Sequence, residues 1–202
     1  MSLFVTFEGA DGIGKSTICS LIYEELKKRS LKVMRTREPG GTKISEAIRD
    51  IILDNDNKEM DIRCEALLYA ASRAQHVYEK IRPALNDGYI VLCERYVLSS
   101  IAYQAYGRDQ RQEDIFAIND YATGGLKPDI NFIFQNKEDT HRRKSTPLDR
   151  LEKAGDAFHE KVREYYRNIE KEDNYYFIDA SQSIEKVYED TLKILESIGG
   201  LK

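Results

Sequence analysis

The chain has 202 residues, of which 41% are hydrophobic and 33% are charged, and its formal net charge at pH 7 is −4. This length suits one domain with a single sizeable core. The acidic balance argues against sequence-independent binding of DNA or RNA, which needs a surplus of Lys and Arg on one face.

The sequence contains three widely spaced cysteines, Cys19, Cys64 and Cys93, and no C-x-x-C pair. This usage predicts free thiols in a reducing cytoplasm rather than disulfides or a metal site. No signal peptide is expected, because the N-terminus enters a predicted strand at once. No apolar run approaches the roughly 18 residues that would span a membrane.

The first predicted unit is a strand at residues 3–7, a glycine-rich turn at 9–16 and a helix at 17–29. The turn reads G-x-x-x-x-G-K-S, which is the P-loop motif in the strand–loop–helix setting that it requires. Its glycines let backbone N–H groups converge on phosphate oxygens, while Lys15 adds a full positive charge and Ser16 a hydroxyl for Mg²⁺. The motif predicts that a nucleoside triphosphate binds to Gly9, Ala10, Asp11, Gly12, Ile13, Gly14, Lys15, Ser16 and Thr17.

The rest of the chain alternates between short apolar runs and stretches of helical periodicity. Thr42 is expected to cap a helix, a long helix is expected to be kinked or broken near Pro83, and residues 137–150 form a polar, basic stretch expected to be a mobile loop. In chain order the predicted elements are a strand at 32–36, helices at 42–53 and 62–85, a strand at 89–93, helices at 99–104 and 112–123, a strand at 130–134, a helix at 151–171, a strand at 175–178 and a helix at 184–198.

Five short strands separated by helices predict an α/β domain with a parallel sheet and helices on both faces. Sheets of this kind bind ligands at the carboxyl ends of their strands. The functional edge is therefore expected in the loops at 8–15, 37–42, 94–104, 136–150 and 179–182.

Three classes of P-loop protein compete for this pattern. A GTPase switch would read guanine with N-K-E-D at residues 136–139, but it also needs a D-x-x-G after a strand, which the sequence lacks outside the P-loop. A motor or transporter ATPase would need a strand that ends in an acidic pair, whereas Arg95 follows Glu94. The third class, a small phosphotransferase that acts on a nucleotide, has positive support.

This support comes from an arginine after a strand and from a pair of residues on a helix. Arg95 follows the buried strand at 89–93, so its guanidinium is expected in the same crevice as Lys15, where it could bind phosphate oxygens. Tyr69 and Arg73 lie four residues apart on a helix face with small alanines, which makes a slot for a planar base. The plainer alternatives are a strand-capping arginine, and a half-buried tyrosine beside a solvated arginine.

Taken together, these residues resemble those of bacterial thymidylate kinases from one end of the chain to the other. The matching strings are F-E-G with the P-loop, T-R-E-P-G-G-T at 36–42, L-Y-A-A-S-R at 68–73, E-R-Y-x-x-S-S-x-A-Y-Q at 94–104, K-P-D at 127–129, L-D-R-L-E at 148–152 and I-D-A at 178–180. The resemblance implies one domain over residues 1–202, with a three-layer P-loop kinase fold, a five-stranded parallel sheet and a short lid at about 138–150. It also implies ATP-dependent phosphorylation of dTMP to dTDP in dTTP biosynthesis, with Mg²⁺, in a cytoplasmic homodimer.

The resemblance further implies roles for the matching residues. Tyr69 would stack on the thymine ring, Arg73 would contact its O4, and Tyr103 would crowd the 2′ position and so favour deoxyribose. Mg²⁺ would be bound by Ser16, Asp11 and Glu94, although aspartate is usual at the position of Glu94. The residues that would bind dTMP are Asp11, Arg37, Glu38, Pro39, Arg49, Tyr69, Arg73, Arg95, Ser99, Ser100, Tyr103 and Gln104.

Gly12 stands where some members of the family place an arginine, so a catalytic arginine is expected to come from the lid. The predicted catalytic residues are Lys15, Arg95, Arg142, Arg143 and Arg150. The remaining alternatives are a non-catalytic nucleotide sensor or GTPase-like switch, and a kinase for another deoxynucleoside or its monophosphate. No nucleic-acid or membrane partner is expected.

Overall fold

The computed structural model describes residues 2–136 and 148–199 of the chain. A parallel sheet of five strands forms its centre, in the order β2-β3-β1-β4-β5. The predicted parallel sheet is confirmed, and every strand lies within one residue of its predicted bounds. The strands are β1 (Leu3–Glu8), β2 (Val33–Arg37), β3 (Ile90–Glu94), β4 (Ile130–Gln135) and β5 (Tyr175–Asp179).

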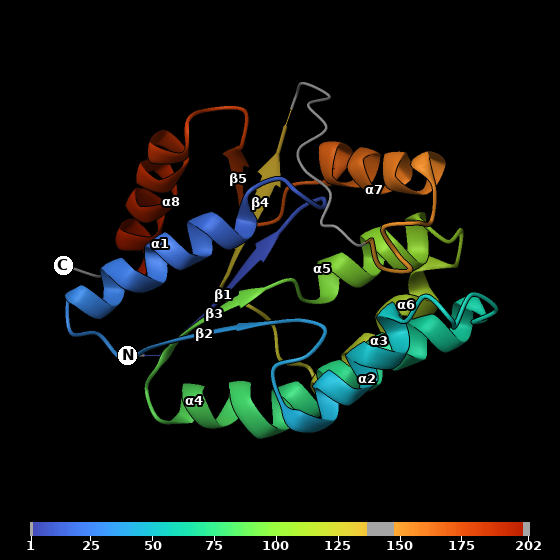
Figure 1. Ribbon diagram of the computed structural model, residues 1–202. Coiled ribbons are helices and arrows are strands. Elements are labelled where there is room, and N and C mark those ends of the chain that lie inside the picture. Colours follow the sequence, from blue (N-terminus) through green and yellow to red (C-terminus); the bar gives the residue numbers. More distant parts are fainter. Residues whose placement is uncertain (1, 137–147, 200–202) are drawn as a thin grey trace.

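Helices cover both faces of this sheet. On one face, α1 (Lys15–Lys28) and α8 (Ile184–Gly199) pack against the central strands, burying Ile22, Leu26 and Leu195 completely (Figure 1). On the opposite face, Val77 and Ile81 pack against Phe4 and Val91 of the strands. The sheet is thus the middle of three layers, and its central strands are buried on both sides as a parallel sheet requires.

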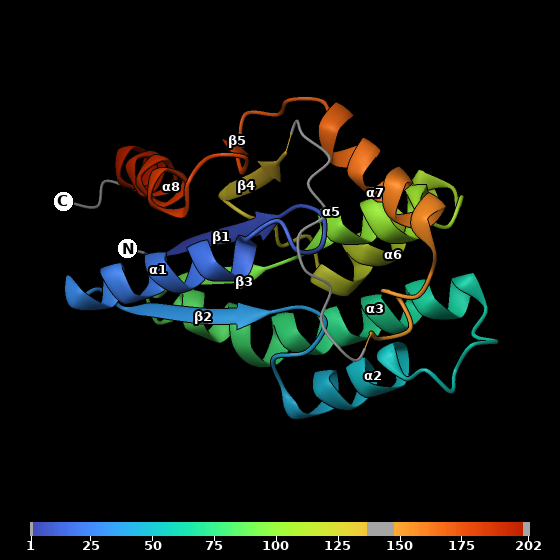
Figure 2. The same ribbon diagram turned by 45° about the horizontal axis from the view of Figure 1, so that its top comes forward.

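A second group of helices lies beyond the carboxyl ends of the strands (Figure 2). These helices have a hydrophobic core of their own, which includes Ile52, Ala66, Ile101, Phe158 and Val162. They form one wall of the region that faces the P-loop. Their members are α2 (Lys43–Leu53), α3 (Ile62–His76), α5 (Val97–Ser100), α6 (Gln112–Thr123) and α7 (Asp156–Asn168).

The long helix predicted at 62–85 is present, but its irregularity starts before Pro83. α3 continues through a π-helical segment, Val77–Ile81, into the short helix α4 (Arg82–Asn86), which carries Pro83 in its first turn. Proline has no N–H to donate to the preceding turn, so a change of helical register ahead of it is physically reasonable. A second π-helical segment, Ile101–Tyr106, extends α5 and places Tyr103 and Gln104.

The helix predicted at 151–171 is shorter than expected, because α7 spans only Asp156–Asn168. Residues 149–152 form a closed turn instead, in which the Asp149 N–H donates to Glu152 Oε2 (3.0 Å) and the Glu152 N–H donates to Asp149 Oδ1 (2.8 Å). Gly155, at φ +96°, then separates this turn from α7. The Asp149 and Glu152 side chains satisfy the backbone N–H groups of the turn locally. The chain therefore does not form a helix at Leu151, although the apolar residues there have helical spacing.

The strand register brings the functional loops to one edge. Phe7 of β1 pairs with Glu94 of β3, and Arg37 of β2 pairs with the same residue, so three strands end side by side. The predicted free thiols are confirmed, with Cys19 and Cys93 buried and Cys64 exposed. Within residues 2–136 and 148–199, no helix is long and apolar enough to cross a membrane.

Candidate active site

The P-loop joins β1 to α1 in a conformation that depends on its glycines. Gly14 caps α1 at φ +102°, and a side chain at Gly9 would lie 2.8 Å from the Phe134 carbonyl oxygen. The loop therefore packs tightly on β4 while its backbone turns toward the helix N-terminus. Lys15 Nζ donates to the carbonyl oxygens of Gly9 (2.9 Å) and Ala10 (2.6 Å).

The electrostatic environment of Lys15 is unusual. Burial and the positive charge of Arg95 together lower the pKa of its ammonium group to about 7, against the opposing effect of Asp11 and other carboxylates. The side chain is a buried cation whose hydrogen bonds are to neutral carbonyls. Such a group would be stabilised by an anion placed against it.

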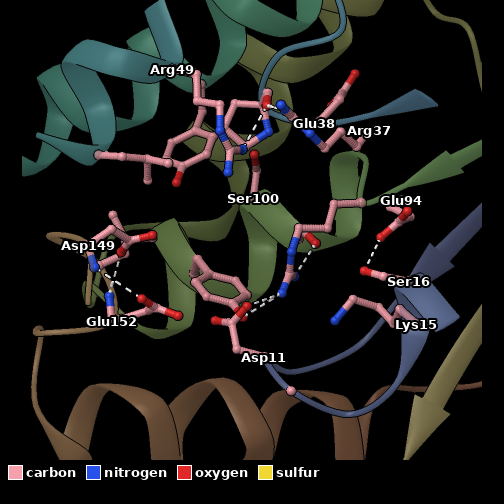
Figure 3. Close-up of a pocket in the computed structure, with 18 of the residues that line it drawn as sticks. Asp11, Lys15, Ser16, Arg37, Glu38, Arg49, Glu94, Ser100, Asp149 and Glu152 are labelled. Carbon is pink, nitrogen blue, oxygen red and sulfur yellow. Dashed lines mark hydrogen bonds and ion pairs between the residues drawn. The ribbon is translucent and has the colours of Figure 1, made fainter. Parts of the chain in front are cut away.

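A cavity of about 430 Å³ lies between the P-loop and the helices beyond the sheet edge. All the predicted dTMP-binding residues line it, together with Gly12, Gly14, Lys15, Ser16, Thr17 and Glu94. Figure 3 shows Arg37, Glu38 and Arg49 on one side of this cavity and Asp11, Lys15 and Ser16 on the other. Residues predicted from separate parts of the sequence thus meet at one place, whereas Gly9, Ala10 and Ile13 of the P-loop do not line the cavity.

Arg95 connects the two sides of the cavity. Its Nη1 donates to the Gly9 carbonyl (3.1 Å) and Ser99 Oγ (3.0 Å), and its Nη2 donates to Asp11 Oδ1 (2.6 Å) and the Tyr103 hydroxyl (3.0 Å). Its backbone is held at φ +67°, a left-handed conformation that is uncommon for a non-glycine residue. Strained residues of this kind cluster at functional sites.

Asp11 is held ionised by its neighbours in the cavity. The Tyr103 hydroxyl donates to its Oδ2 (2.7 Å), while Arg95 bonds the other oxygen. Burial works against ionisation, but the charges of Arg95 and Lys15 and these hydrogen bonds lower the pKa of Asp11 to about 2. The carboxylate therefore remains negative throughout the neutral pH range.

A buried carboxylate that the sequence analysis did not single out lies behind Arg95. Glu8 is fully buried and accepts from the Tyr96 N–H (2.7 Å), Ser99 Oγ (2.6 Å) and the Tyr166 hydroxyl (3.1 Å). Burial raises the pKa of Glu8, against the effects of Ser99 and Arg95. Its partners come from distant parts of the chain, so no local sequence pattern could have identified this network.

Two arginines converge on a single backbone oxygen at the opposite wall. Arg37 Nη1 (2.8 Å) and Arg49 Nη1 (2.9 Å) both donate to the Pro39 carbonyl. Burial lowers the pKa of Arg49, and the charge of Arg37 beside it acts in the same direction. Two guanidinium groups that share one neutral acceptor beside a cavity are suited to binding a phosphate or another oxyanion.

Arg73 and Tyr69 lie where the base-binding slot was predicted. Both line the cavity, with the buried Ala66 and Ala70 on the same helix. Arg73 is only 2% exposed, and its Nε donates to Glu38 Oε2 (2.6 Å). Its guanidinium also lies over the Tyr96 ring at 5.3 Å. The arginine is thus fixed in place, which excludes the alternative of a solvated side chain.

A set of oxygen donors lies at the end of β3 beside α1. Ser16 Oγ donates to Glu94 Oε2, and Arg35 Nη2 donates to Glu94 Oε1 (2.6 Å). A hydroxyl and a carboxylate are ligands that Mg²⁺ prefers, so Ser16 and Glu94 fit the predicted metal site. Asp11 is engaged instead by Arg95 and Tyr103.

Of the predicted lid arginines, the structure describes Arg150 alone. Arg142 and Arg143 lie outside the described residues. Arg150 is described but does not line the cavity, because its Nη2 donates to Glu65 Oε2 (2.8 Å) and its Nε to the Ile52 carbonyl (2.7 Å). The cavity also has lining residues for which no role was predicted, and these are Leu53, Asp149, Leu151 and Glu152.

Comparison with known proteins gives a consistent result. Residues 7–191 match the family model described as thymidylate kinase. The chain is 48% identical to the thymidylate kinase of Finegoldia magna, covering 96% of this chain and 98% of that protein, and 44% identical to that of Halalkalibacterium halodurans, covering 96% and 95%. The crystal structure of thymidylate kinase from Ehrlichia chaffeensis superposes with a TM-score of 0.78 at 32% identity, covering 96% of this chain and 98% of that one.

Proposed function

Since the chain belongs to the thymidylate kinase family, we propose that it transfers the γ-phosphate of ATP to dTMP, forming dTDP and ADP for dTTP biosynthesis. One observation carries the proposal. A single cavity has the P-loop Lys15 on one side, the convergent Arg37 and Arg49 on the other, and Arg95 between them. It therefore offers cations for two phosphate groups within one enclosure.

Phosphoryl transfer to dTMP requires that negative charge be neutralised, but it does not require a general base. A phosphate monoester has a second pKa of about 6, so dTMP is already a nucleophilic dianion at neutral pH. Two unit charges about 4 Å apart repel by about 4 kcal/mol at an effective dielectric near 20. Lys15 would offset this repulsion at the donor, Arg37 and Arg49 at the acceptor, and Arg95 between them.

The other cavity residues suit recognition of the nucleoside. Tyr69 would stack on the base, Arg73 with Ser100 and Gln104 would bond its edge, and Tyr103 would crowd the sugar. Glu38, Pro39 and Ser99 would complete this wall. The proposal rests on the presence of all these side chains around one cavity.

Ser16 and Glu94 would hold Mg²⁺, which when bound would neutralise charge on the transferred phosphate. Arg35 would keep the Glu94 carboxylate in place through its ion pair. Asp11 would act on the acceptor side, because its carboxylate bonds Arg95 and Tyr103. The P-loop would in this way contact both substrates.

Arg142, Arg143 and Arg150 are proposed as further catalytic side chains, supplied by the lid in place of an arginine at Gly12. Arg150 would have to break its ion pair with Glu65 to reach the cavity, so this ion pair would oppose that movement. Closure of such a segment would exclude water from the transferring phosphate. We also propose that the protein is cytoplasmic and forms a homodimer.

A panel of monophosphate acceptors tests the substrate assignment. Purified protein with ATP and Mg²⁺ should release ADP fastest with dTMP, and far more slowly with dCMP, dGMP or the ribonucleotide UMP. No dTMP-dependent release together with rapid turnover of another monophosphate would refute the assignment. A preference for guanine over adenine nucleotides, without any turnover, would favour a switch instead.

A further inference from the structure

Arg73 uses its hydrogen-bonding groups almost completely within the protein. Besides Glu38, it donates from Nη1 to Ser100 Oγ (2.9 Å) and Asn119 Oδ1, and from Nη2 to the Tyr96 carbonyl (2.7 Å). A guanidinium has five N–H groups, and four are bonded here. Within the described part of the chain the remaining Nη2–H has no partner, while Arg73 lines the cavity. The side chain is thus a fixed donor with a single N–H left for a ligand.

Glu38 fixes the orientation of this guanidinium, and it is itself held by a histidine. His76 Nδ1 lies 3.0 Å from Glu38 Oε1, and His76 Nε2 lies 2.7 Å from Thr36 Oγ1. The charge of Arg73 and the hydrogen bonds from Arg73 and His76 lower the pKa of Glu38, against the effect of burial. An ionised carboxylate only accepts, so the tautomer with its proton on Nδ1 satisfies both contacts.

The surroundings of His76 are shaped to hold its ring. The imidazole is completely buried, and it does not line the cavity. A side chain at Gly41 would lie 2.6 Å from His76 Nε2, so the loop that carries Glu38 closes directly over the ring. Thr36, His76, Glu38 and Arg73 therefore form one continuous buried chain from β2 to the cavity.

We propose that His76 is a positioning residue that, through Glu38, aims the free N–H of Arg73 and so sets the preference of the site for a base carbonyl over a base amino group. The inference rests on the proposed function, since it concerns the base of the acceptor nucleotide. A guanidinium only donates, so it bonds a carbonyl oxygen and rejects an amino group at the same place. The site discriminates strongly against a base amino group only while the Arg73 guanidinium cannot rotate away from it.

Two substitutions of similar size separate the contacts of His76. In His76→Asn, the amide nitrogen can take the place of Nδ1 and still donate to Glu38. In His76→Gln, the longer amide reaches toward Thr36 instead, so Glu38 loses its second donor. The measurements are the KM for dTMP, the KM for ATP, and the inhibition constants of dUMP and dCMP, which differ in the carbonyl or amino group at C4 and share the same sugar and phosphate.

We expect His76→Gln to raise the KM for dTMP and to narrow the ratio of the dUMP and dCMP inhibition constants, each by roughly tenfold, because a charged hydrogen bond is lost. His76→Asn should stay near the unmodified protein, and the KM for ATP should stay constant in both. Equal loss in both variants, or an unchanged base ratio in His76→Gln, would overturn the inference. If the unmodified protein releases no ADP with dTMP, the proposed function fails as well.

A measurement on the unmodified protein covers the case in which the variants do not fold. The ¹⁵N chemical shifts of the His76 ring report which nitrogen carries the proton. We expect Nδ1 to carry the proton that it donates to Glu38. A ring protonated on Nε2 alone would contradict the donation to Glu38 and overturn the inference.

Discussion

At the scale of single residues, Arg95 is the side chain on which the alignment of two phosphates depends most. It bonds the P-loop at Gly9 and Asp11 and the opposite wall at Ser99 and Tyr103. We expect Arg95→Ala to lower kcat by about a thousandfold, because one well-placed arginine contributes roughly that much to phosphoryl transfer. The affinity for ATP, measured by calorimetry, should change by less than about threefold, since Lys15 and the loop backbone remain.

The control is Arg63→Ala, because Arg63 is an arginine on α3 whose side chain is 81% exposed. It should leave kcat within the error of the measurement. Arg95→Lys should recover only part of the lost rate, since an ammonium group keeps the charge but not the planar fork. Loss of ATP affinity in parallel with kcat would contradict a bridging role for Arg95.

The lowered pKa of Lys15 predicts that the protein takes up protons when it binds ATP. Its pKa of about 7 in the free protein means that the group is mostly neutral at about pH 8. Bound phosphates favour the charged form, so ATP binding should take up a proton, with an uptake that increases from about pH 6 to about pH 8. Calorimetry of ATP binding in buffers of different ionisation enthalpy measures this number directly.

Lys15→Arg provides the comparison, because an arginine stays charged at every pH of the experiment. Its binding enthalpy should not depend on the buffer through this group. Proton release by the unmodified protein, or an uptake that decreases toward pH 8, has the wrong sign for a lysine whose pKa is lowered. Either result would contradict a pKa of Lys15 that burial and the charge of Arg95 lower.

Among the helices and loops, Glu65 connects α3 to the segments that carry Gln104, Arg108 and Arg150. Its carboxylate is 1% exposed and accepts from Arg150 Nη2 (2.8 Å), Arg108 Nη2 (3.0 Å) and Gln104 Nε2 (3.3 Å). Glu65→Gln should lower the free energy of unfolding in urea by about 3 kcal/mol, because it leaves buried arginine charge without its partner.

Glu113→Gln is the matched control, since the Arg111–Glu113 pair is 3.8 Å apart and both side chains are 76% exposed. Exposed pairs contribute little, so this change should stay below about 0.5 kcal/mol. Equal effects of the two substitutions would show that Glu65 does not organise this region.

The helices and strands also show how much of the structure could be predicted from the sequence. The strands and most helices follow from local apolar patterns, and all the predicted dTMP-binding residues face one cavity because parallel strands end at one edge. The start of α7 was predicted wrongly. Residues 149–152 could satisfy their backbone hydrogen bonds either in a helix or in a turn, and reciprocal hydrogen bonds between Asp149 and Glu152 stabilise the turn. Glu8, Glu65 and His76 were missed because their partners lie far away in sequence, so only the folded chain reveals them.

At the scale of the whole molecule, one group of neighbouring helices leaves large apolar side chains uncovered. α3 packs against both α2 and α6. The exposed side chains on these helices include Ile51 (48%), Leu67 (56%) and Tyr121 (91%). Large apolar side chains that stay exposed on neighbouring helices are typical of an interface between protein chains. We expect sedimentation equilibrium at micromolar concentration to give twice the mass of one chain.

Leu67→Asp should shift this equilibrium toward the single chain, because a carboxylate would be buried in the interface. Ile184→Asp is the control, since Ile184 is 48% exposed on α8, which packs against α1 and β5. A single-chain mass for the unmodified protein, or equal effects of the two substitutions, would contradict a dimer through α2, α3 and α6.

The central claim is direct transfer between two nucleotides held in one cavity. The most direct test is to incubate the protein with Mg²⁺, dTMP and ATP labelled in its γ-phosphate, and to follow where the label goes. We expect the label to appear in the β-phosphate of dTDP, in step with the ADP released. Label released as inorganic phosphate at the same rate with or without dTMP would contradict it.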